Sequence, residues 1–123
     1  MIGYTSLGTN DLNRSAAFYD ELFKMLGIGR LMEVSDFIVW GQDMSSANFS
    51  IHLPVDGNSA SVGNGVMVAL SAKNSEEVDR VYAKALELGG TDEGAPGPRG
   101  DTGFYAGYFR DLDGNKLNLH CMG

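Results

Sequence analysis

One of the two histidines in the chain lies where an internal repeat predicts the centre of a site. A shift of 66 positions brings His52 onto Asn118, and a shift of 63 positions brings Tyr4 onto Met67. Equivalent residues of two repeated modules face each other across a pseudo-twofold axis. We therefore expect Tyr4, His52, Met67 and Asn118 to point into one cleft and to bind a ligand there.

The imidazole of His52 is suited to three kinds of chemistry. It can anchor a ligand by a hydrogen bond, act as a general base, or bind a metal ion. His120 lies two residues beyond Asn118 and shares its strand face, so His52, Asn118 and His120 form a second possible set around an ion. His120 lies about 6.6 Å further along the strand than Asn118. The alternative interpretation places His120 at the rim of the pocket or at a dimer contact.

Three further residues are candidates for ligand binding, and a fourth is not. Arg99 lies in a loop rich in proline and glycine, where a guanidinium suits an anionic group of a substrate or is simply solvated. Trp40 and Tyr105 are candidates for the wall of an apolar pocket, although about half the residues of each strand must pack under a helix instead. The single cysteine, Cys121, points away from its histidine neighbour, which predicts a buried, unreactive thiol.

The elements that must position these residues form the same pattern twice. In the first half we predict a helix that begins at Asn10 or Asp11, ends near residue 26, and carries an apolar stripe. The strands predicted around it span residues 2–8, 31–34, 37–41 and 48–53. Residues 54–65 are rich in Gly, Ser and Asn and form the linker between the halves.

The second half repeats this order. A strand over 66–72 precedes a helix whose start is marked by Asn74 and Glu77, and two glycines end the helix near residue 89. Residues 91–93 show little strand character, and 94–103 are predicted to form a loop. Strands over 104–110 and 116–121 are joined by Asp113 and Gly114, a typical hairpin turn.

These elements predict an α+β fold of two tandem βαβββ modules. The modules span about 1–58 and 63–123, and together they form one domain over residues 1–123. Only two helices accompany eight short strands, which excludes a parallel βαβ array. We expect two curved mixed sheets, each with a helix on its convex face, around a central cleft.

Composition limits the functions available to the chain. Its 123 residues are 43% hydrophobic and 20% charged, which is typical of a folded domain. The net charge of −7 and the scattered cations argue against nucleic acid as a partner. No apolar run approaches the roughly 20 residues that span a bilayer, and the first residues do not resemble a signal peptide. With one cysteine and no internal disulfide, we expect a cytoplasmic protein without a membrane partner.

Two segments resemble a known family. Residues 3–12 read GYTSLGTNDL, and residues 108–120 read YFRDLDGNKLNLH. Together with Ser15, Phe18 and Tyr19, they resemble the vicinal oxygen chelate superfamily. This superfamily includes glyoxalase I, fosfomycin-resistance thiol transferases, extradiol dioxygenases and bleomycin-resistance proteins. The resemblance covers essentially the whole chain and implies the glyoxalase-like fold.

The resemblance also implies where a metal would bind. The metal enzymes of the superfamily have His at the positions of Tyr4 and Met67, and Glu or His at those of His52 and Asn118. Such a site needs three or four N or O ligands and open positions for a chelating substrate. Here one imidazole and one amide remain, beside a phenol and a soft thioether. We therefore predict no metal and no other cofactor.

Two classes of function remain open. The first is a small-molecule binding protein similar to the bleomycin-resistance branch, in which a shaped apolar cleft with a few polar anchors is sufficient. The second is an enzyme of the superfamily, a lyase, isomerase or thiol transferase, that uses His52 or an atypical metal site. The fold alone does not choose between them.

Assembly gives a first testable prediction. Members of the superfamily commonly form homodimers, and the exposed strand edges of a split sheet need to be covered. We expect light scattering to report a homodimer of this 13.2 kDa chain. A mass equal to that of one chain across a wide concentration range would contradict the prediction.

Overall fold

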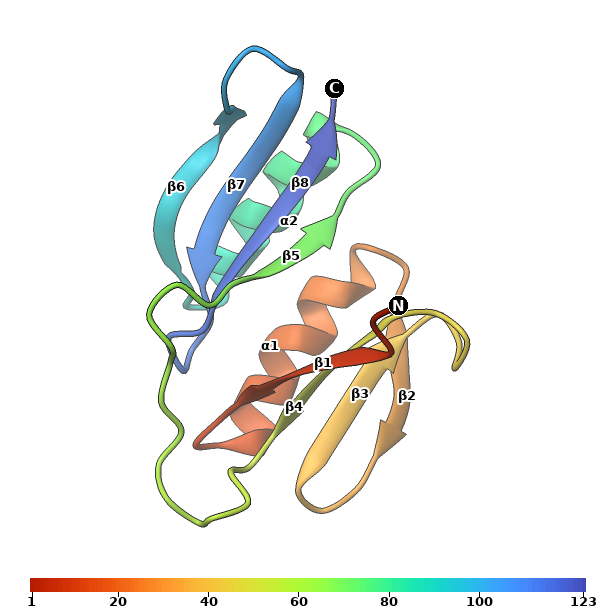
Figure 1. Cartoon of the computed structure of the whole chain (residues 1–123), viewed down its shortest axis with the longest axis vertical. Coiled ribbons are helices and arrows are strands. Elements are labelled where there is room, and N and C mark those ends of the chain that lie inside the picture. The colour runs from red at the N-terminus through yellow and green to blue at the C-terminus, as the bar shows by residue number, and fades with distance from the viewer. The chain divides into compact units, whose positions relative to one another are not determined.

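The computed structural model describes all 123 residues, which form two compact units, residues 1–62 and 63–123. Each unit has one four-stranded mixed sheet and one helix, in the order strand, helix and three strands (Figure 1). The predicted fold class of two βαβββ modules is therefore confirmed. That the two units form a single domain stays a prediction.

Unit 1 is built on a parallel pair of strands. The sheet order is β1-β4-β3-β2, in which β1 runs parallel to β4 and the other neighbours are antiparallel. This pairing joins the first strand of unit 1 to its last strand, so both ends of the unit belong to one sheet. Its elements are β1 (Tyr4–Gly8), α1 (Leu12–Lys24), β2 (Gly29–Glu33), β3 (Phe37–Gly41) and β4 (Asn48–His52).

Unit 2 repeats the topology. Its sheet order is β5-β8-β7-β6, with β5 parallel to β8. The two sheets therefore have equivalent strands at each position, as the sequence repeat predicts. The elements of unit 2 are β5 (Val68–Ser71), α2 (Ser75–Glu87), β6 (Thr91–Pro98), β7 (Phe104–Arg110) and β8 (Lys116–Met122).

The helix starts follow the predicted caps. The carboxylate of Asp11 accepts a hydrogen bond from the backbone N–H of Arg14 at 3.1 Å, which makes Asp11 rather than Asn10 the N-cap of α1. In α2 the amide oxygen of Asn74 accepts from the N–H of Glu77 at 2.9 Å. Each side chain satisfies an N–H group that the first helical turn leaves without a partner.

The structure corrects the prediction of a loop over 94–103. Strand β6 continues to Pro98 and pairs with β7, with shifts in register between Asp92 and Gly94 and between Gly94 and Gly97. Edge strands tolerate proline and glycine at such bulges, because a backbone N–H on the outer side of an edge strand has no neighbouring strand to bond to. Proline, which lacks this N–H, therefore breaks no hydrogen bond of the sheet there. Gly94 has a φ of 150°, which favours glycine. The loop is thus confined to the residues between β6 and β7.

The core of unit 1 is an aromatic cluster between α1 and the sheet. Tyr19 and Phe23 of α1 pack on Trp40 and Phe49, with ring centroids 4.7–5.8 Å apart. All four rings are buried, and Trp40 and Phe49 alternate along their strands with residues of the opposite face. In unit 2 the same layer is formed by small and aliphatic residues of α2 against β7 and β8: Val78, Val81, Ala85, Phe109, Leu117 and Leu119.

A charged network at the edge of this cluster joins the helix to the sheet. Asp20 of α1 accepts hydrogen bonds from the Arg30 guanidinium at 2.9 and 2.7 Å and from the Trp40 indole N–H at 2.9 Å. The hydrogen bond from Arg30 holds the pKa of the Asp20 carboxyl below its usual value, with Trp40 contributing in the same direction. This network fixes α1 against β2 and β3.

Neither of the two helices has the length and the apolar character needed to cross a membrane.

The Asp20 network predicts a pH-dependent stability. Because the folded-state pKa is lowered, its contribution is present above the ordinary carboxyl pKa and is lost as pH falls through the lower folded value. Since Asp20 is 38% exposed, we expect Asp20→Asn to lower the free energy of unfolding by only about 1 kcal/mol at pH 7. Urea unfolding should show this loss shrinking as the pH falls below the ordinary carboxyl pKa. A loss of the same size at pH 2, or an equal loss for the exposed neighbour in Glu21→Gln, would contradict it.

Candidate functional site

The register of β1 against β4 decides which side chains reach the face of the unit 1 sheet opposite α1. We call this the open face of the sheet. Ser6 pairs with Ser50, and Gly8 pairs with His52, so these residues share the open face with Tyr4. The intervening residues of both strands point under the helix instead. Sequence alternation therefore separates a polar face from the apolar core.

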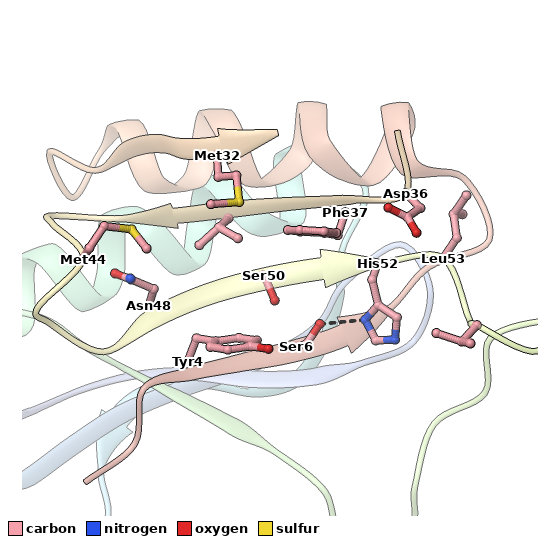
Figure 2. Close-up of a pocket in the computed structure, with 12 residues that line it drawn as sticks. Tyr4, Ser6, Met32, Asp36, Phe37, Met44, Asn48, Ser50, His52 and Leu53 are labelled. Atoms are coloured by element: carbon pink, nitrogen blue, oxygen red, sulfur yellow. Dashed lines mark hydrogen bonds between the residues drawn. The ribbon is translucent and has the colours of Figure 1, made fainter. Parts of the chain in front are cut away.

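A cavity of about 490 Å³ lies on this open face, and we call it the unit 1 pocket. Figure 2 shows that its walls come from β1, β2, β3 and β4 and from the segments that follow β2, β3 and β4. The volume is in the range of pockets that bind small organic molecules. The residues lining it are Tyr4, Ser6, Met32, Asp36, Phe37, Val39, Met44, Asn48, Ser50, His52, Leu53 and Val55.

At one end of the pocket, His52 is held by Ser6. The Ser6 Oγ and His52 Nδ1 atoms lie 2.6 Å apart (Figure 2). When Ser6 donates this hydrogen bond, the neutral ring carries its proton on Nε2 and offers a donor. In the opposite tautomer Nδ1 donates to Ser6, and Nε2 offers a lone pair that can accept a proton. Ser6 thus fixes the ring and leaves Nε2 for a ligand.

At the other end, Asn48 begins β4 with an unpartnered side-chain oxygen. The residue is 91% buried, and its Oδ1 has no hydrogen-bond partner. A buried acceptor without a partner costs about 1–3 kcal/mol in protein stability. The side chain lies over Gly41 of β3, where an added Cβ atom would meet Oδ1 at 1.9 Å. Glycine at position 41 therefore makes room for the Asn48 amide.

The remaining walls of the pocket are apolar and adaptable. Met32 and Met44 supply thioethers, and Phe37 supplies a ring, on the side of β2 and β3 (Figure 2). Methionine fits irregular ligands and makes favourable contacts with aromatic rings. Asp36 is the only carboxylate in the lining, and neither lysine nor arginine is among the lining residues. The pocket therefore suits an apolar molecule without negative charge.

Unit 2 holds three of the predicted site residues on or near its own open face. The side chains of Asn118 and His120 are joined by a hydrogen bond of 3.1 Å between Oδ1 and Nδ1. The His120 ring stacks on Phe104 with centroids 5.6 Å apart. Met67 precedes β5 and is 39% exposed. That Met67 and Asn118 share one cleft with Tyr4 and His52 stays a prediction.

Arg99 follows β6 and folds back on its own strand. Its guanidinium donates to the main-chain oxygens of Ala95 at 2.7 Å and Gly97 at 2.9 Å. It also lies over the Tyr108 ring, 5.3 Å from the centroid. These contacts give Arg99 a structural role at the end of β6. The predicted contact with an anionic ligand group stays a prediction.

Two aromatic residues predicted for the pocket lie on the wrong face. Trp40 is 1% exposed and packs under α1. The Tyr105 hydroxyl donates to Asp79 of α2 at 2.7 Å, a hydrogen bond that raises the pKa of Tyr105. Both residues alternate with open-face neighbours along their strands, and their side chains cover the helix side. We therefore leave Trp40 and Tyr105 out of the site.

Several pocket residues are absent from the predicted set. Alternation from Tyr4 leads to Ser6, and alternation backwards from His52 leads to Ser50 and Asn48. The sequence therefore carries a signal for these three residues, although the repeat points only to the two ends of the pattern. The two methionines carry no such signal, because Met44 follows β3 outside any strand and the register of β2 shifts between Arg30 and Met32.

The fold and the sequence together define the class of this protein. The family model of the Glyoxalase/Bleomycin resistance protein/Dioxygenase superfamily matches residues 1–119. The chain belongs to this superfamily. This agrees with the vicinal oxygen chelate resemblance found in the sequence.

Solved structures with similar folds include members of the same superfamily. The chain is similar to a glyoxalase/bleomycin resistance protein from Albidiferax ferrireducens T118, with 34% identity, a TM-score of 0.89, and coverage of 98% of this chain and 97% of the other. A hypothetical protein from S. aureus is 27% identical, with a TM-score of 0.74 and coverage of 98% and 91%. A lactoylglutathione lyase from Agrobacterium tumefaciens shares the fold at 19% identity, with a TM-score of 0.69 and coverage of 98% and 92%. A comparison with curated proteins gives no match.

The donor set at the positions implied by the superfamily does not fit a divalent catalytic metal. His52 is the one strong ligand, and its Nδ1 already bonds to Ser6. The Asn118 oxygen bonds to His120, while Met67 offers only a soft thioether. No group of three or more His, Cys, Asp or Glu side chains is arranged to share an ion. We derive no chemistry through a metal at this site.

The contact between Gly41 and Asn48 predicts that alanine substitutions at Gly41 and at Gly29 differ in their effect on stability. Gly41→Ala should displace the Asn48 amide or strain the sheet, which lowers the free energy of unfolding by about 1–3 kcal/mol. Its cross-strand partner Gly29 has open space where an added methyl group would lie, so Gly29→Ala should change stability by less than about 0.5 kcal/mol. Chemical denaturation of both variants checks this. Equal stability of the two variants would contradict the packing described for Asn48.

Proposed function

We propose that the chain binds a small organic molecule in the unit 1 pocket without a catalytic metal ion. The observation that carries this proposal is a cavity of about 490 Å³ with apolar walls and a few polar groups, Asn48 and His52 among them. Such a combination of apolar walls with a few convergent polar groups is typical of small-molecule sites. The superfamily to which the chain belongs includes proteins named for bleomycin resistance, and this agrees with a binding role.

In this proposal His52 anchors the ligand. Its Nδ1 atom is occupied by Ser6, so Nε2 is the ring atom that meets the bound molecule. Tyr4 is 67% exposed and offers a phenol whose ring can cover the ligand. The sequence repeat extends the proposed site to Met67, Asn118 and, at its rim, His120. We also propose a homodimer located in the cytoplasm.

The pairing of Ser6 with His52 supports a second candidate function, an enzyme of the superfamily. With its proton on Nδ1, the His52 ring presents Nε2 as a general base toward the pocket. Metal analysis of protein purified without an affinity tag separates binding without a metal from an enzyme with an atypical metal site. The binding proposal predicts no stoichiometric Ni, Zn, Mn or Fe, whereas one equivalent of any of these metals would favour the enzyme.

Thermal melts of His52→Ala test the anchor. We expect the variant to keep the melting temperature of the wild type without ligand, because His52 lies at a pocket wall and not in the core. The stabilisation by the best compound from a thermal-shift screen should fall, since losing one hydrogen bond to a ligand costs about 1 kcal/mol, or 1.5–3 if the partner is charged.

A matched variant separates loss of a donor from loss of shape. Because His52→Gln keeps an N–H donor at similar reach, it should recover part of the ligand shift. A His52→Ala protein that melts several degrees lower without ligand, and still shows the full ligand shift, would remove His52 from the site.

A further inference from the structure

The unpartnered oxygen of Asn48 indicates the class of ligand. We infer that the unit 1 pocket takes an elongated aromatic molecule, uncharged or cationic, that donates an N–H or O–H hydrogen bond to the Asn48 side chain. This inference rests on the proposed function and makes it more specific. It assigns Asn48 as the residue that selects among molecules of similar shape.

Asn48 is exceptional within this chain. Its Oδ1 is the only buried side-chain nitrogen or oxygen atom that lacks a hydrogen-bond partner. The large majority of such atoms in folded proteins have one, and an exception requires an explanation. Asn48 also lines the unit 1 pocket, so turning its amide from Gly41 toward the cavity would let a bound molecule supply the missing donor. Figure 2 shows the amide beside Met44 at the pocket wall.

A purely structural role does not explain the side chain. The backbone N–H of Asn48 already bonds to Gly3 at 3.0 Å, so the strand end is closed without the amide. Gly41 leaves the space in which the amide lies, and an aliphatic side chain of similar size would fill that space without an unpaired polar atom. The cost to stability is therefore consistent with a binding role.

The shape and charge of the pocket set the remaining properties of the ligand. Asn48 and His52 are four strand residues apart, which places their Cα atoms about 13 Å apart along β4. Phe37 and the methionines flank the space between them and favour a flat aromatic body. Asp36 disfavours an anion, and no lysine or arginine in the lining compensates for it.

Three probes of nearly identical shape test the inference. Biphenyl-4-carboxamide is neutral and carries an N–H donor, methyl biphenyl-4-carboxylate is neutral without a donor, and biphenyl-4-carboxylate is an anion. Titration of the ¹⁵N-labelled full chain, followed by NMR, reports the affinity for each. We expect the amide to bind about tenfold more tightly than the ester, the factor that one hydrogen bond contributes, and the anion to bind most weakly. The Asn48 side-chain NH₂ signals should shift with the amide.

Variants of Asn48 test its role directly. Asn48→Leu should raise the melting temperature by a few degrees, because it removes the unpaired oxygen, and should bind amide and ester equally. The matched control is Asn13→Leu on the exposed side of α1, which should retain the tenfold preference. If Asn48→Leu does not fold, the comparison of amide and ester binding by the wild type still tests the role of Asn48, because it needs no variant.

The outcomes distinguish the two proposals. Equal binding of amide and ester by the wild type, with shifts in unit 1 pocket residues, would overturn the role of Asn48 and leave the pocket as the binding site. Tighter binding of the anion would overturn the assigned charge. Failure of all three probes to bind, or shifts confined to residues outside the pocket, would overturn the proposed function together with this inference.

Discussion

The parallel pairing of β1 with β4 is the constraint on which the rest of the site depends. This pairing joins the first strand of unit 1 to its last, and its register places Ser6 beside Ser50 and Gly8 beside His52. Shifting a strand by one residue exchanges its two faces. The aromatic cluster under α1 resists such a shift, because it would move Phe49 and Ile51 out of the core. Burial of the helix face therefore fixes the polar residues on the open face.

The same constraint explains why the pocket combines stability with unpaired polar groups. The helix face supplies the packing, with four aromatic rings in contact and the Asp20 network at its edge. The open face has little part in that packing, so it tolerates an unsatisfied Asn48 oxygen. It also tolerates a histidine held only by Ser6. Proteins commonly place such locally unfavourable groups at binding sites, where a ligand compensates for them.

Much of this arrangement is predictable from the sequence. The repeat and the strand periodicity predict both modules, their helices and eight strands, although β6 is indicated only weakly and only over residues 91–93. They also predict the positions of Tyr4 and His52. Sequence cannot assign Trp40 and Tyr105 to a face, because aromatic residues suit either side of a sheet and only the register decides. The rest of β6, residues 94–98, escapes prediction because glycine and proline usually interrupt strands, whereas an edge strand with bulges accommodates them. The hydrogen-bonding state of Asn48 depends on Gly41 across the sheet, which no local pattern reveals.

The most direct test of the account is a measurement on methionine methyl groups. The chain has six methionines, and Met32 and Met44 line the unit 1 pocket. In protein labelled with ¹³C at these methyl groups, an aromatic compound that raises the melting temperature should shift the Met32 and Met44 signals, because a ring bound between them changes their local magnetic field. Met25, beyond the end of α1, should not respond. Stabilisation by the compound without any change at Met32 and Met44 would contradict binding in this pocket.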